Sequence, residues 1–163
     1  MKRITTLSFF MLFCWITAFA IPRAEYPRPQ FERNAWINLN GEWTYSFDFG
    51  GSGLEREWFK STGFDQKIIV PFCPESKLSG VEYKDFINHM WYHRTISIPQ
   101  DWSNKQVLLN FGAVYYKSEI YIDGVFAARH FGGTSSFQVD ITPYVKAGQT
   151  HNLVVYVESD VRS

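Results

Sequence analysis

The sequence predicts an all-β fold, and more narrowly an antiparallel β-sandwich of the jelly-roll kind. Three observations lead to this prediction. Apolar side chains recur mostly with a period of two, turn residues interrupt the chain every 8–15 positions, and patterns with a helical period are weak. About eight short strands fit this scheme, and the chain shows no internal repeat or low-complexity segment.

Four strands are predicted before residue 112. Residues 43–49 alternate aromatic side chains with small polar ones, which is typical of a strand with one buried face, so Phe49 is expected on that face. Residues 67–70 form a shorter apolar run. Residues 91–98 alternate again, and 107–111 form another apolar strand.

A tight hairpin is the clearest local prediction. Asp123-Gly124 separates the apolar segments of 118–131, and this dipeptide suits a type I′ turn because both central positions need a positive φ. Two further strands are predicted at 137–141 and 152–158. Both alternating sets in 152–158 are largely apolar, which indicates a central strand covered on both sides.

Helical segments are predicted to be short. Residues 54–60 fit one or two turns. Residues 142–146 fit a single turn, with Thr142 as the N-cap and Pro143 at the first helical position.

The N-terminus has the pattern of a secretory signal peptide. Two basic residues, Lys2 and Arg3, precede an apolar run, and Ala18-Phe19-Ala20 supplies the small residues of a cleavage site. We expect cleavage after Ala20 and a periplasmic or extracellular protein. A membrane anchor is the alternative, but the run is shorter than the roughly 20 residues of a spanning helix. Residues 21–35, rich in proline and charge, are expected to be an extended lead-in to a sandwich over 36–163.

Composition and motif spacing argue against several classes of function. Removing residues 1–20 takes away two of sixteen basic residues and none of sixteen acidic ones, which leaves 143 residues with a formal net charge of −2. Such a chain gives no electrostatic basis for binding nucleic acid. Only Cys73 remains, so no internal disulfide is expected. No metal-binding spacing or phosphate-binding loop occurs, and we predict no metal and no cofactor.

An ordered set of motifs resembles the N-terminal region of glycoside hydrolase family 2, which includes bacterial β-galactosidases and β-glucuronidases. The motifs are RPQF at 28–31, WINLNGEW at 36–43, VPFCPES at 70–76, LSG at 78–80, WYHR at 91–94, LNFGAV at 109–114, IYIDG at 120–124, HFGG at 130–133 and FQVDIT at 137–142. Tyr115 departs from the pattern, because relatives of this type often have an aspartate there.

The resemblance implies a galactose-binding-like jelly roll that precedes an immunoglobulin-like sandwich and a TIM barrel with both catalytic glutamates. On this basis we expect an accessory sugar-binding fragment with carbohydrate and the remaining domains as partners, no catalytic residue in this chain, and no membrane contact after cleavage. Asp160 matches an aspartate that contacts sugar hydroxyls in the family, and a carboxylate suits this role because both of its oxygens accept hydrogen bonds.

Two other readings remain open. In the first, the chain is a free-standing carbohydrate-binding module. In the second, it is a structural interaction domain without a ligand. Among individual residues, Trp43 and Trp91 are expected in the core, and Asp48 is expected to be a solvated surface charge. Acidic residues of a family hydrolase act in pairs about 5 Å apart, and their number alone indicates no catalytic pair here.

Overall fold

The computed structural model describes residues 35–159, and residues 1–34 and 160–163 lie outside the described part. The predicted signal peptide, most of the lead-in and Asp160 therefore fall outside it. Within 35–159 the chain forms β-strands and short 3₁₀ turns and no α-helix, which confirms the predicted all-β class. The strands are β1 (Gly41–Phe47), β2 (Gln66–Val70), β3 (His89–Ser97), β4 (Leu108–Phe111), β5 (Lys117–Ile122), β6 (Val125–Phe131), β7 (Phe137–Asp140) and β8 (Thr150–Glu158).

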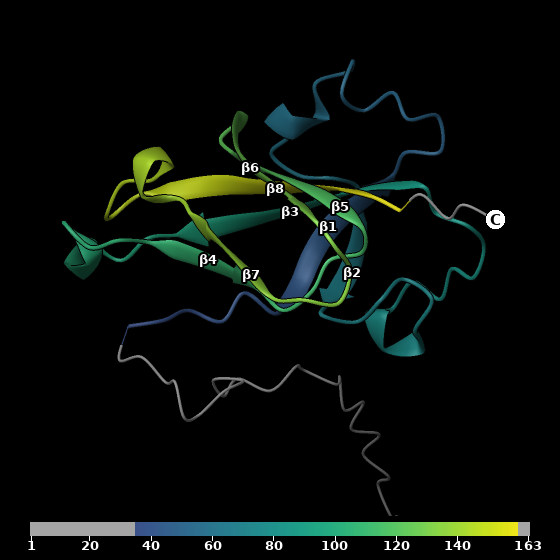
Figure 1. The fold of residues 1–163 in the computed structure, drawn as a ribbon, viewed down its shortest axis with the longest axis horizontal. Coiled ribbons are helices and arrows are strands. Elements are labelled where there is room, and N and C mark those ends of the chain that lie inside the picture. The colour runs from purple at the N-terminus through teal and green to yellow at the C-terminus, as the bar shows by residue number, and fades with distance from the viewer. Residues whose placement is uncertain (1–34, 160–163) are drawn as a thin grey trace, which may run out of the picture.

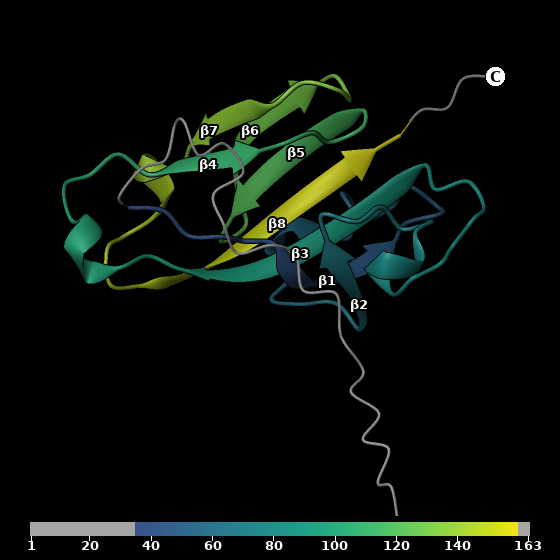
Figure 2. The ribbon, with the colours of Figure 1, turned by 90° about the horizontal axis from the view of Figure 1, so that it is seen from below.

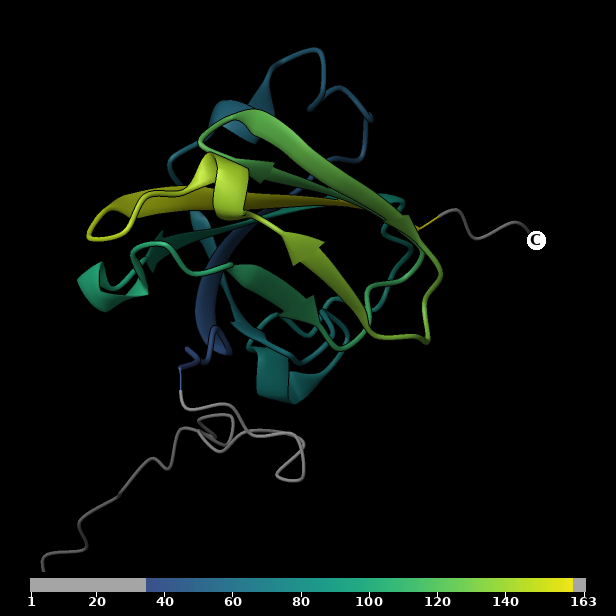
Figure 3. The same cartoon turned by 60° about the vertical axis from the view of Figure 1, so that its left-hand side comes forward.

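The strands form two antiparallel sheets (Figures 1, 2 and 3). The larger sheet has the order β2-β1-β3-β8-β5-β6, and the smaller sheet pairs β4 with β7. β3 and β8 form the longest ladder, from His89 opposite Glu158 to Ser97 opposite Thr150. This central ladder carries the residues of the candidate site at one of its ends.

The central strands of the larger sheet are buried on both faces. One face packs against the β4–β7 pair, and the shared core includes Trp43, Ile120 and Leu153. The other face carries Trp91, Tyr121, Val154 and Tyr156, which are covered by aromatic side chains of the 58–64 segment, namely Trp58, Phe59 and Phe64. β8 therefore contributes to both cores, which confirms its prediction as a central strand. Trp43 and Trp91 are both buried, as predicted.

The end of β1 differs from the prediction. The alternation holds through Phe47, but Phe49 is 63% exposed because the strand ends there and the chain turns. Asp48, predicted to be a surface charge, is only 4% exposed. Its carboxylate accepts hydrogen bonds from the Ser52 and Gly53 backbone N–H groups and from the indole of Trp91, at 3.0, 2.8 and 3.1 Å. Three donors offset the cost of desolvating this charge.

The Asp123-Gly124 hairpin is confirmed. Asp123 and Gly124 have φ values of 49° and 79°, as a type I′ turn requires. The Asp123 side chain also accepts hydrogen bonds from His151 Nδ1 at 2.6 Å and from the Asn152 backbone N–H at 2.7 Å. The turn is therefore fixed to the start of β8 as well as to its own strands.

The two helical predictions are confirmed only as single 3₁₀ turns, η2 (Trp58–Lys60) and η5 (Thr142–Tyr144). Two further turns are η3 (Lys77–Ser79) and η4 (Gln100–Trp102). The predicted cap at Thr142 is wrong: Ile141 occupies the N-cap position of η5. Thr142 Oγ1 instead accepts a hydrogen bond from the Val107 backbone N–H at 2.8 Å, because the two segments run side by side at the end of the sandwich.

Candidate functional site

The predicted sugar-contacting residue, Asp160, lies outside the described residues, but the structure describes the strand that leads to it. β8 ends at Glu158, opposite His89 of β3 and Lys117 of β5. The Ser159 backbone N–H then donates to the Asn88 carbonyl oxygen at 2.8 Å. We call this end of the larger sheet, where β3 and β5 begin and β6 and β8 finish, the exit end.

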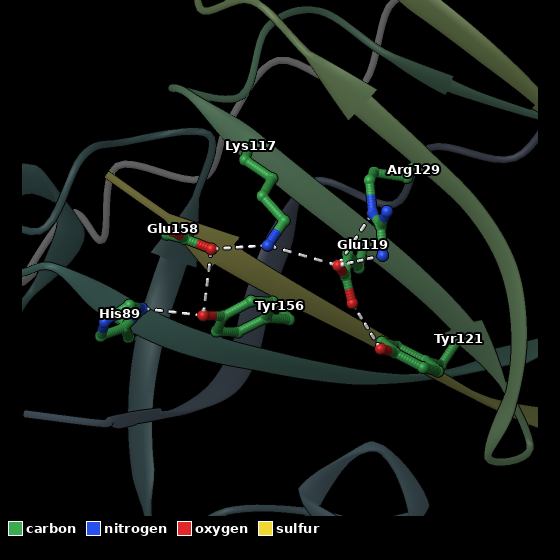
Figure 4. A network of polar contacts seen from close by, with 7 residues as sticks. All are labelled: His89, Lys117, Glu119, Tyr121, Arg129, Tyr156 and Glu158. Carbon is green, nitrogen blue, oxygen red and sulfur yellow. Dashed lines mark hydrogen bonds and ion pairs between the residues drawn. The ribbon is translucent and has the colours of Figure 1, made fainter. Parts of the chain in front are cut away.

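Period-two spacing places a row of polar side chains on one face of the exit end. Lys117, Glu119 and Tyr121 alternate along β5, and Tyr156 and Glu158 alternate along β8. Figure 4 shows these side chains pointing toward one another over the sheet. Together with neighbours from β3 and β6 they form one connected network, which comprises His89, Lys117, Glu119, Tyr121, Arg129, Tyr156 and Glu158.

Glu119 is the buried anchor of the network, at 4% exposure. It accepts hydrogen bonds from the Tyr121 hydroxyl at 2.6 Å and from Arg129 Nε at 2.9 Å, and Lys117 Nζ lies 3.5 Å away. Burial by itself raises the pKa of this carboxyl, but the Tyr121 hydrogen bond and the charges of Lys117 and Arg129 outweigh it and lower the pKa. Glu119 is therefore ionised at neutral pH.

Glu158 ends the network on the side where β8 leaves the sheet. Lys117 Nζ donates to its carboxylate at 2.6 Å, and the Tyr156 hydroxyl lies 3.4 Å away. The Tyr156 hydroxyl also makes a 2.8 Å hydrogen bond with His89 Nδ1. Burial and the nearby Glu158 charge raise the pKa of Tyr156, so its hydroxyl keeps its proton.

This arrangement supports positioning rather than acid–base catalysis. A general acid needs a carboxyl group whose pKa is raised toward the working pH, whereas the pKa of Glu119 is lowered. Lys117 bridges Glu119 and Glu158, so both carboxylates are engaged within the protein. The network thus fixes the end of β8, and with it Ser159, against its two neighbouring strands.

Three exposed aromatic rings lie beside the network and form what we call the aromatic patch: Tyr115, Tyr116 and Phe131. They are 57%, 46% and 56% exposed. The rings of Tyr115 and Tyr116 have centroids 5.8 Å apart, and those of Tyr116 and Phe131 are 6.3 Å apart. The Tyr116 backbone N–H donates to the Glu158 carbonyl oxygen at 3.2 Å, which joins the patch to the end of β8.

The sequence singled out only part of this site. Tyr115 stood out as a departure from the family pattern, whereas Tyr116, Phe131 and the seven network residues were not identified. The alternation along 117–121 was a usable signal for polar residues on one face of a strand. Residues 35–159 contain no group of three or more His, Cys, Asp or Glu side chains arranged to hold a metal ion. The same range contains no helix long and apolar enough to cross a membrane.

Comparisons with known proteins give a consistent family match. A family model described as "Glycosyl hydrolases family 2, sugar binding domain" matches residues 37–161. The chain is similar to the beta-glucuronidase of Felis catus, with 30% identity over 135 residues, covering 76% of this chain and 20% of the relative. It is also 29% identical to the beta-glucuronidase of Streptococcus agalactiae over 114 residues, covering 70% of this chain and 18% of the relative.

Solved structures show the same likeness. The chain superposes on the beta-glucuronidase of Ruminococcus gnavus in complex with a C6-substituted uronic isofagomine, with a TM-score of 0.68 and 26% identity over 74% of this chain and 21% of that one. A complex of that beta-glucuronidase with D-glucuronic acid gives a TM-score of 0.64 at 26% identity, over 74% of this chain and 21% of that one. The chain spans about one fifth of the length of the curated relatives it matches.

Proposed function

This chain belongs to glycosyl hydrolase family 2, as its sugar binding domain, and on that premise we propose that it is the accessory sugar-binding domain of a secreted β-glucuronidase-type glycoside hydrolase. In this role the domain binds and positions carbohydrate, and other domains of the same protein cleave the glycosidic bond. The aromatic patch and the exit end form the surface that faces those domains and the sugar.

The geometry of the exit end is the observation that carries the proposal. Glu158 and Ser159 are held by Lys117 and Asn88, and Asp160 follows Ser159 directly in the chain. In the family that this chain resembles, an aspartate at this position contacts sugar hydroxyls, and both oxygens of a carboxylate accept hydrogen bonds. Asp160 is our proposed substrate-binding residue on this basis.

Catalysis is assigned to the rest of the protein. Retaining hydrolysis needs two carboxyl groups about 5 Å apart, one as nucleophile and one as acid/base. The two carboxylates of the exit end are instead joined through Lys117. The family resemblance implies an immunoglobulin-like sandwich and a TIM barrel, and we propose these as partner domains, with the catalytic pair on the barrel.

Export is part of the same proposal. The basic and apolar segments of residues 1–20 and the Ala18-Phe19-Ala20 sequence indicate a signal peptide that places the domain in the periplasm or outside the cell. N-terminal sequencing of the protein recovered from the medium or the periplasm tests this. The expected mature N-terminus is Ile21.

The main test uses the gene and the purified chain. Sequencing beyond codon 163 is expected to reveal an open frame that encodes a barrel. The 163-residue chain alone is expected to leave a nitrophenyl glucuronide intact, and appreciable hydrolysis by it would overturn the proposal. In the longer enzyme, Asp160→Asn is expected to lower kcat/KM about tenfold or more, since a charged hydrogen bond to substrate is lost.

One observation favours a second candidate function, a free-standing carbohydrate-binding module. The aromatic patch leaves three rings exposed, and aromatic rings supply the flat apolar surface on which pyranose rings stack. Calorimetric titration of the isolated chain with glucuronides and galactosides distinguishes the two functions. Binding without any other domain that shifts the NMR signals of Tyr115, Tyr116 and Phe131 supports the module, and absence of binding at this patch supports the accessory role.

A further inference from the structure

A groove at the opposite end of the sandwich has features of a separate ligand site. It has a volume of about 620 Å³, and η4 and η5 lie on its two sides. Figure 1 shows these two turns at the left-hand end of the molecule and the C-terminus at the right. β8 separates the two ends, and its nine residues span roughly 26 Å at about 3.3 Å per residue. We call this feature the distal groove.

The lining of the distal groove is mixed, and its apolar part belongs to the core. Ile98 and Val107 form part of the lining and are 6% and 7% exposed. Trp102 is partly buried, packs on the same core and also lines the groove. An aromatic ring beside a rigid apolar floor is a suitable surface for the C–H face of a pyranose ring.

Hydrogen-bonding groups on the rim are held in fixed positions. The Asp140 carboxylate accepts from Gln106 Nε2 at 2.7 Å and from the Thr142 backbone N–H at 2.9 Å. These bonds lower the pKa of Asp140, so it stays ionised, and they also orient the Gln106 amide. Both residues line the groove and are exposed, so the amide and the remaining lone pairs of the carboxylate are accessible for hydrogen bonds with sugar hydroxyls.

Two lysines give the groove its charge preference. Lys105 and Lys146 both line it and are exposed, and neither forms an ion pair with another residue of the described part of the chain. The lysines at positions 60, 67 and 117 are each paired with a glutamate, whereas Lys77 and Lys84 form no ion pair within residues 35–159 either. Lys105 and Lys146 differ from these two because both line the same groove. Two free ammonium groups beside one engaged carboxylate favour an anionic ligand.

We propose that the distal groove is a second carbohydrate-binding site, selective for oligosaccharides that carry uronic acid carboxylates. Lys105 and Lys146 bind the carboxylate, the Gln106 amide and Asp140 bind hydroxyls, and a sugar ring packs on Trp102. Because the groove lies at the far end of β8, it binds carbohydrate independently of the exit end. This site goes beyond the proposed accessory role and does not depend on it.

The test is a titration of the purified 163-residue chain with tetragalacturonic acid, followed by calorimetry and by ¹⁵N-resolved NMR. The fully methyl-esterified tetrasaccharide serves as the uncharged probe. The expected result is binding of the acid with shifts at residues 102–107 and 140–147, and markedly weaker binding of the ester. Added salt is expected to weaken binding of the acid, because the lysines are exposed and their charges are screened.

Variants provide the matched comparison. The double substitution Lys105→Ala and Lys146→Ala is expected to weaken binding of the acid about tenfold, because charged hydrogen bonds to its carboxylate are lost. Lys77→Ala with Lys84→Ala removes the same charge from another exposed surface and is expected to leave affinity unchanged. All four lysines are exposed, so both variants are expected to fold.

Three outcomes would overturn the proposal: no binding of the acid, equal binding of acid and ester, or an equal loss of affinity in the two double variants. Shifts confined to Tyr116, Phe131 and their neighbours would also overturn it. That last outcome would at the same time support carbohydrate binding at the exit end, so the two proposals fail separately.

Discussion

The lysines at the two ends of the sandwich differ in whether they form ion pairs. At the exit end, Glu119 and Glu158 are both bound to Lys117, and their charges are used within the protein. At the distal groove, Lys105 and Lys146 are exposed and have no ion-pair partner in the described part of the chain. The difference leaves the ammonium groups of the distal groove, unlike that of Lys117 at the exit end, available to bind an anionic ligand. The tryptophans also differ, because Trp91 near the exit end is fully buried and Trp102 at the distal groove is only partly buried.

The largest expected effect is a difference in unfolding free energy between alanine variants of two tryptophans, Trp91 near the exit end and Trp102 at the distal groove. Trp91 is completely buried and packs on Tyr156 with ring centroids 4.6 Å apart, whereas Trp102 is only partly buried. Trp91→Ala is expected to lower the free energy of unfolding by about 4 kcal/mol through the cavity it creates, and Trp102→Ala by about half as much. Urea denaturation of both variants measures this, and equal losses would contradict the contrast.

The next effect concerns the network itself. Glu119→Ala leaves Tyr121 and Arg129 without their carboxylate, so we expect a loss of about 2–3 kcal/mol in the free energy of unfolding. The value lies at the low end for a buried pair because Arg129 is half exposed. Lys105→Ala at the distal groove is the control and is expected to change stability by less than about 0.5 kcal/mol. A control loss as large as that of Glu119→Ala would remove the distinction between the two ends.

A pH dependence follows from the lowered pKa of Glu119. A carboxyl whose pKa is lower in the folded state than in the unfolded state stabilises the fold fully above the unfolded pKa, near 4.5. This contribution is lost as the pH falls from that value through the lower, folded pKa. Thermal unfolding between pH 7 and pH 2 is expected to show a steeper acid loss for the native chain than for Glu119→Gln. Parallel profiles would show that Glu119 is not the group responsible.

The smallest expected change in unfolding free energy concerns two buried polar atoms inside the sandwich at the exit end. Ser118 Oγ and His130 Nε2 are buried without a hydrogen-bond partner among residues 35–159, and the two residues are opposite each other on β5 and β6. Ser118→Ala removes an unsatisfied hydroxyl with little change in shape. We expect a change in unfolding free energy between about zero and a 1 kcal/mol gain, measured by the same urea titration. A clear loss of stability would show that the hydroxyl does have a partner.

The strands were accessible to prediction because their signals are local. The period-two pattern, the Asp123-Gly124 turn and the two apolar faces of β8 each depend on neighbours within a few positions. The predictions of burial were wrong where a contact with a segment distant in sequence determines whether a side chain is exposed. Asp48 was predicted on the surface because a single carboxylate between aromatic residues carries no sign of the Trp91 indole that binds it, 43 positions along the chain. The exposure of Phe49 follows from the same turn.

By itself, the sequence determined the all-β class, the order of the strands along the chain, the tight hairpin and the family to which the domain belongs. These depend on alternation, turn chemistry and ordered motifs, which are properties of short segments. Only the tertiary structure decided which strands are neighbours, and therefore that Lys117 of β5 meets Glu158 of β8. It also decided that Lys105 and Lys146 form no ion pair with any acid among residues 35–159. Pairing between strands joins residues far apart in sequence, and the charge balance at each end of the sandwich arises only from that pairing.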